Sequence, residues 1–132
     1  FTNWVYTGGG LGGGASGSNP DSVLADEIVV NDTLTRKAYK QTGYSLSSFN
    51  IAGGGEQVTM AGRGYRSNGQ YYDMSTTAPL VTNSGGDYLS GSLRFAGAGN
   101  TVVQAQVVPG AKLRASLTLN GQPVAAGSAC GA

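Results

Sequence analysis

The residue types that do most side-chain chemistry are scarce in this chain. It contains no histidine, so it lacks the usual partner of a serine or cysteine nucleophile and the commonest general base. Cys130 is the only cysteine, and one thiol cannot build a zinc or iron–sulfur site. Since no intrachain disulfide can form, Cys130 is either a buried, inert thiol or a link between chains.

The acidic residues are not arranged for catalysis. Asp26 and Glu27 are adjacent, which places them on opposite faces of a strand, and Glu56, Asp73 and Asp87 are far apart in the sequence. Glycoside cleavage needs a pair of carboxyl groups, one on each side of a cleft. We therefore expect no enzyme activity and no metal site.

Residues 12–17 match the G-x-G-x-x-G pattern of dinucleotide sites, but they lie inside a glycine tract. A dinucleotide site also needs a helix that follows the motif and packs on a parallel sheet, and Pro20 would interrupt such a helix soon after the motif. No nucleotide or other cofactor is expected.

Aromatic residues form the first candidate binding surface. Sugar rings stack on exposed aromatic side chains, and the candidates here are Trp4, Tyr65, Tyr71 and Tyr72. Tyrosines on the two arms of a hairpin more often pack against each other across the strands. Both roles stay open, and polysaccharide is a candidate partner.

Basic residues form the second candidate surface. Arg94, Lys112 and Arg114 fall at polar positions of expected strands and would contact phosphates if they shared one face. Ordinary solvation is the alternative. A nucleic-acid partner is expected only if the protein is a coat protein.

Composition favours an extracellular, assembled β-protein. Charged residues make up 11% of the 132 positions, against about 25% in typical soluble domains, and 23 positions are glycine. Residues 1–35 carry four acids and no base, whereas the rest carries all eight bases and three acids. The two parts could complement each other within one chain or between neighbouring copies, or the charges could simply be scattered. Phe1 in place of an initiator methionine indicates either a terminus made by cleavage, as in export, or a chain whose start has been removed. No apolar run reaches the ~20 residues of a membrane span.

The clearest structural pattern lies at residues 100–124. Apolar and polar residues alternate strictly over residues 112–119, which predicts a half-buried strand. Pro109-Gly110 before it and Asn120-Gly121 after it are turn signals. Residues 89–96 alternate in the same way.

Similar signals recur along the rest of the chain. Asn68-Gly69 predicts a hairpin over residues 63–72, and a change of phase at Ser47-Ser48 predicts a β-bulge or bend. Asn19-Pro20-Asp21 predicts one helical turn. Short strands with frequent turns indicate a mostly β fold, an antiparallel β-sandwich or barrel-like sheet with little helix.

The N-terminus predicts an assembly arm. Residues 1–7 are aromatic and β-branched, with Phe1, Trp4, Val5 and Tyr6 as contact residues, and residues 8–18 form a glycine-rich tether. We expect residues 1–18 to be this arm and residues 19–132 to be a single antiparallel β domain. Residues 1–7 can pair with a neighbouring subunit's sheet edge or dock on their own chain.

Together these features predict a non-enzymatic structural protomer that self-assembles. Copies of the chain would be its partners, in an extracellular filament or pilus or in a virus coat, at the cell surface or in a virion. The alternative is a secreted carbohydrate-binding module that uses the surface aromatics.

Overall fold

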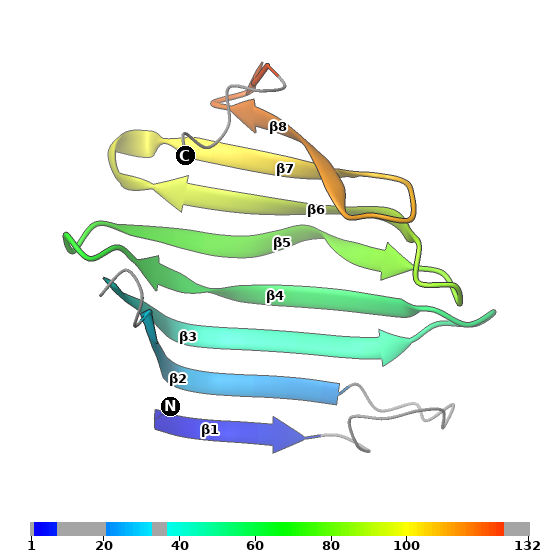
Figure 1. The fold of residues 1–132 in the computed structure, drawn as a ribbon, viewed down its shortest axis with the longest axis horizontal. Coiled ribbons are helices and arrows are strands. Elements are labelled where there is room, and N and C mark those ends of the chain that lie inside the picture. Colours follow the sequence, from blue (N-terminus) through cyan, green and yellow to red (C-terminus); the bar gives the residue numbers. More distant parts are fainter. Residues whose placement is uncertain (1, 8–20, 33–36, 126–132) are drawn as a thin grey trace.

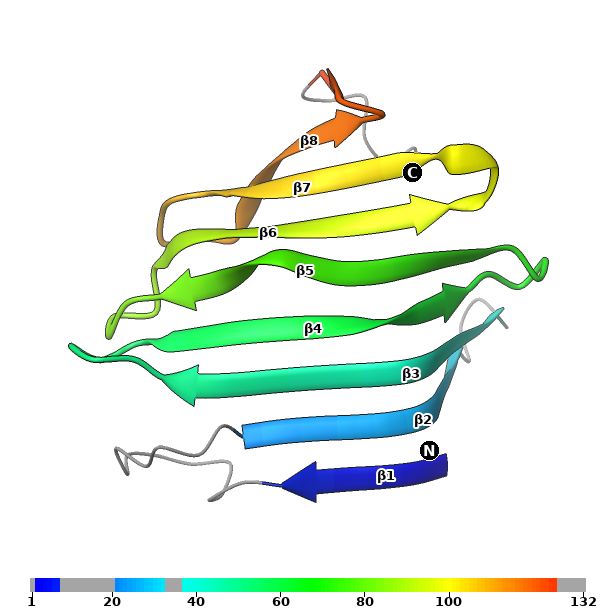
Figure 2. The same cartoon turned by 180° about the vertical axis from the view of Figure 1, so that it is seen from behind.

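The computed structural model of the protein describes residues 2–7, 21–32 and 37–125. Strands and one 3-10 turn make up its secondary structure (Figures 1 and 2). The elements in chain order are β1 (Thr2–Thr7), β2 (Asp21–Asp32), β3 (Lys37–Asn50), β4 (Glu56–Tyr65), β5 (Tyr71–Thr82), β6 (Tyr88–Gly97), η1 (Ala98–Asn100), β7 (Val102–Val108), β8 (Arg114–Leu119) and β9 (Gln122–Pro123).

The nine strands form one antiparallel sheet in which every strand pairs with its neighbours in the sequence, from β1 at one edge to β9 at the other. The prediction of a mostly β, antiparallel fold with little helix is confirmed. Figures 1 and 2 show a single open layer that is not closed into a barrel, and the described residues contain no second sheet to make a sandwich.

Turn chemistry explains the predicted hairpins. Asn120 and Gly121 both have positive φ, 50° and 82°, as the turn between β8 and β9 requires. Between β4 and β5, Gly69 has a φ of 82°, and the side-chain oxygen of Asn68 accepts a hydrogen bond from the backbone N–H of Gln70. Both hairpins form where the sequence predicted them.

The bulge and the helical turn are placed differently from the predictions. The register of β3 against β4 shifts between Thr42 and Ser45, where Gly43 has a φ of 56°, rather than at Ser47-Ser48. Glycine accepts this left-handed conformation without strain, so the extra residue is accommodated there. The predicted helical turn is wrong from Asp21 onward, since β2 begins at that residue; Asn19 and Pro20 lie outside the described residues.

The register separates the side chains into two faces. One row of residues crosses seven strands and defines the apolar face: Val23, Leu46, Met60, Thr76, Leu93, Ala105 and Leu117. The residues next to them in the chain form a parallel row on the opposite, polar face: Leu24, Ser45, Ala61, Ser75, Arg94, Gln104 and Thr118. Thr76 belongs to the apolar row because it lies opposite Leu93. Its hydroxyl donates to the carbonyl of Met60 and accepts from the Met60 N–H.

Neither face contains a deep core. Among the described side chains, Ala25 and Val107 are the buried apolar ones, Ser92 is the buried polar one, and no large side chain is fully buried. All seven members of the apolar row are half-buried. Because the sheet is a single layer, its apolar face remains partly open to solvent.

Candidate functional site

The polar face carries two ion pairs near the end of the sheet at which the turn joins β4 to β5. Arg63 lies opposite Asp73, and its Nε and Nη2 donate to the two carboxylate oxygens of Asp73 at 2.7 and 3.0 Å. This two-pronged hydrogen bond from Arg63, helped by the charge of Arg94, lowers the pKa of Asp73. Lys40 pairs with Glu27 on the neighbouring strands, and the hydrogen bond to that carboxylate raises the pKa of Lys40.

Two tyrosines complete this cluster. Tyr65 and Tyr71 lie directly opposite each other, with ring centroids 6.1 Å apart and planes tilted by 52°. The guanidinium of Arg63 lies 4.1 Å from the centre of the Tyr71 ring, and the ammonium of Lys40 lies 5.8 Å from that of Tyr65. Each ring therefore has a cation over it, in the geometry of a cation–π contact.

Tyr72 does not join the other two tyrosines. Because it follows Tyr71 in a strand, it points to the apolar face, where its ring centroid lies 6.0 Å from that of Phe95. The ring also covers Gly64, at which an added Cβ would clash with Tyr72 Cζ. The four aromatic candidates therefore do not form one surface. Tyr65 and Tyr71 share one face, and Tyr72 lies on the other. The side chain of Trp4 is outside the described part of the structure.

The Arg63–Asp73 pair yields a pH prediction. Replacing Asp73 by asparagine should lower stability slightly at neutral pH, because the two side chains are 40% and 49% exposed and exposed pairs contribute little. The folded-state pKa of Asp73 lies below its ordinary value of 3.8, so the contribution is present above that pH and is lost as the pH falls through the folded-state pKa. Urea unfolding of both proteins across this range measures it, and a difference that persisted unchanged in strong acid would contradict the assignment.

The three basic candidates do not form a cluster. Arg94 and Arg114 share the polar face, but the register separates them by four residues, about 13 Å along the strands, and by two strand spacings, about 10 Å. Lys112 lies in the turn before β8. Arg94 and Arg114 are therefore too far apart to bind one phosphate group together.

The N-terminal strand is an edge strand of the same sheet. Trp4, Val5 and Tyr6 lie in β1 opposite Ala25, Leu24 and Val23 of β2. Phe1, the tether of residues 8–18, the glycine motif of residues 12–17 and Cys130 lie outside the described residues. The backbone of the expected arm therefore pairs with its own chain in this structure.

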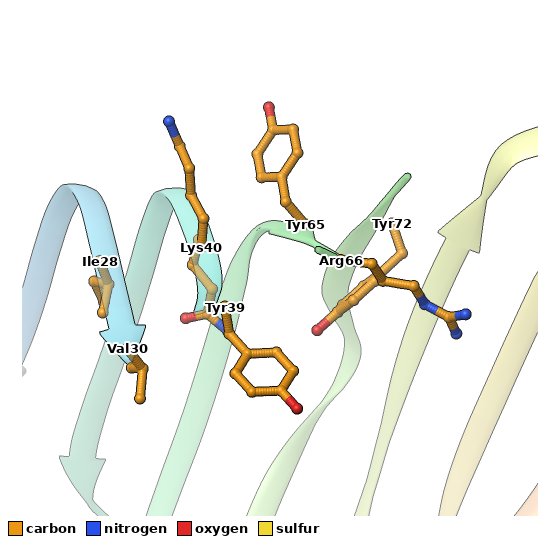
Figure 3. A pocket seen from close by; sticks show the side chains of 8 residues that line it. Ile28, Val30, Tyr39, Lys40, Tyr65, Arg66 and Tyr72 are labelled. Carbon is orange, nitrogen blue, oxygen red and sulfur yellow. The ribbon is translucent and has the colours of Figure 1, made fainter. Parts of the chain in front are cut away.

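An open pocket of about 280 Å³ lies where β2 and β4 end and where β3 and β5 begin. Its lining includes Ile28, Val30, Tyr39 and Tyr72. Figure 3 shows these four side chains on one side of the sheet, whereas Lys40 and Tyr65 project from the other side. Tyr39 is 48% exposed and was not among the aromatic candidates. Tyr39 lies opposite Val30 because β2 pairs with β3, and no turn signal in the sequence predicts that pairing.

Within residues 2–7, 21–32 and 37–125, no group of three or more His, Cys, Asp or Glu residues is placed to hold a metal ion. No helix in this described part is long and apolar enough to cross a membrane. No protein family, curated protein or solved structure matches the chain at a significant level.

Proposed function

We propose that this protein is a non-enzymatic structural protomer that self-assembles, as the subunit of an extracellular filament or pilus or of a virus coat. The observation that carries the proposal is the single open layer, in which the described part of the chain buries no large side chain fully. Domains ordinarily bury the apolar side of a sheet against a second layer. Association of protomers would supply that layer.

Exposed apolar side chains support this proposal. Val30 is 56% exposed, Tyr39 48% and Leu119 44%, and they lie on the apolar side of β2, β3 and β8 (Figure 3 shows the first two). Such exposure over a whole sheet is typical of interaction surfaces. Low charge, 11% of residues, removes most of the repulsion that would keep copies apart.

The first test is the native mass. Light scattering over a range of protein concentrations, with negative-stain images of the same samples, should show particles several times heavier than the 13.3 kDa chain. A 13.3 kDa species at every concentration would overturn the proposal.

The arm gives a second prediction. β1 makes its hydrogen bonds with β2 at an edge, and a neighbouring copy's β1 could make the same bonds by exchange of the strand. Deleting residues 1–18 should therefore lower the native mass, because the contacts made through β1 are lost, and leave the sheet from β2 to β9 folded. Circular dichroism reports the fold and light scattering the mass, and unchanged assembly would show that β1 is not the linking strand.

A carbohydrate-binding module is the second candidate, favoured by the Tyr65–Tyr71 pair on the polar face, in which Tyr65 is half-buried and Tyr71 is exposed. Tyr71 is 43% exposed, but Arg63 already covers one side of its ring, which leaves less area for a sugar. If the rings bind sugar, Tyr71→Ala should lose retention on insoluble polysaccharide and Tyr39→Ala on the other face should not. Equal retention of both variants and the unaltered protein would count against this function.

A further inference from the structure

We infer that the apolar face is the contact between two copies of this chain, stacked face to face as the two layers of a β-sandwich. The inference rests on the proposed function and specifies which surface the copies use. It starts from the apolar row, whose members come from β2 to β8. Each member lies opposite the next across the sheet, except that Met60 and Thr76 are joined through hydrogen bonds of the Thr76 hydroxyl with the Met60 backbone. This row is continuous, so it presents one surface rather than scattered apolar residues.

The distribution of charge makes this face suitable for burial. The charged side chains described in strands β3 to β8 fall on the polar face, including Lys40, Arg63, Asp73 and Arg94, with one exception. The exception is Glu56, at the first residue of β4, where it accepts a hydrogen bond from Ser48. A second copy seated on this face would therefore leave no unpaired charge at the centre, where burial would be costly.

The surface area points to the same occupant. The apolar row crosses seven strands, a width of about 29 Å at the usual strand spacing, and β3 to β6 are at least ten residues long, or about 33 Å. One face of the sheet therefore covers about 900 Å². A stable interface takes about 800 Å² from each partner, which this face can supply. The same face on a second copy is equally apolar, and a two-fold axis would bring the two rows together at the usual sheet spacing of about 10 Å.

The two methionines report on this face alone. Met60 and Met74 are the only methionines, both lie on the apolar face, and both are half-buried in the single sheet. Oxidation by peroxide to the sulfoxide depends on access to the sulfur. In the stacked form both sulfurs lie between the layers, so oxidation should slow on the order of tenfold relative to a monomeric form.

Adjacent residues of β7 supply a matched pair of variants. Ala105 lies in the apolar row between Leu93 and Leu117, and Gln104 lies next to it on the polar face. Ala105→Glu removes no apolar group and points its charge toward solvent in a single sheet, so the protomer should fold. In the stack that charge would be buried without a partner, so the native mass should fall at least to half. Gln104→Glu adds the same charge to the other face and should leave the mass unchanged.

The experiment combines native mass with mass-spectrometric measurement of methionine oxidation in the unaltered protein and both variants, with circular dichroism as the check of folding. Protected methionines in the unaltered protein and Gln104→Glu, and rapid oxidation at lower mass in Ala105→Glu, would support the stack. Assemblies whose methionines oxidise as fast as those of the Ala105→Glu protein would overturn the stack but leave the proposed function standing, with strand exchange as the contact. A monomer at all concentrations would overturn both, whether or not its methionines were protected.

Discussion

Replacing Gly91 by alanine is expected to lower the free energy of unfolding by about 3 kcal/mol, because strain and crowding coincide at this residue. Gly91 is buried in β6 with a φ of 139°, a conformation that residues with a side chain rarely adopt. An added Cβ would lie 2.7 Å from the Cα of Leu80 and 2.8 Å from the carbonyl oxygen of Pro79. Both are backbone atoms of β5, so the pairing of β5 with β6 would have to shift.

Gly99 provides the control for this substitution. It also has a positive φ, 67°, but an added Cβ would meet no atom within 4 Å. Gly99→Ala should therefore cost only the conformational term, about 1 kcal/mol. Urea unfolding followed by circular dichroism, at one protein concentration because association stabilises the folded state, compares the two. Equal losses would show that the contact with β5 is not the cause.

Replacing Tyr72 by alanine is expected to lower the free energy of unfolding by about 2 kcal/mol. The substitution removes the ring that covers Gly64 and packs against Phe95. The loss is smaller than in a closed core because the ring is only half-buried. Tyr72→Phe keeps the ring and should be nearly neutral.

The adjacent residue is the matched comparison. Tyr71 points to the polar face and is 43% exposed, so Tyr71→Ala should lose well under half as much stability as Tyr72→Ala. Thermal and urea unfolding of both variants measure the difference. If Tyr71→Ala proved the more damaging change, the division of the tyrosines between the two faces would be wrong. The comparison also matters for the sugar-binding test, since Tyr71→Ala probes a surface and Tyr72→Ala probes packing.

The sequence predicts the strands well where alternation and turn residues agree. β6 and β8 carry their apolar residues on one face, and the turns at Asn68-Gly69 and Asn120-Gly121 set the register of their hairpins. The turn centred on Asn68 also places Arg63 opposite Asp73. Local turn geometry is encoded in a few residues and can be read without the rest of the chain.

Features that depend on distant segments could not be predicted in this way. Residues 23–30 lack strict alternation, and their strand state comes from pairing with β1 on one side and β3 on the other. Alternation indicates that one face of a strand is apolar but not what covers that face, so a single layer and a sandwich have the same sequence pattern. The placement of Tyr71 and Tyr72 on opposite faces could have been predicted, because neighbouring residues of a strand point to opposite faces.

The topology of the sheet has a mechanical consequence. β1 and β9 are the two edges, and each strand between them is held only by its neighbours in the sequence. Tension on the two ends of this array would load one pair of strands at a time, and hydrogen bonds would open in succession, as in a zip, rather than shear together. A single copy would therefore resist pulling poorly. In a filament or a shell, tensile strength would have to come from contacts between copies.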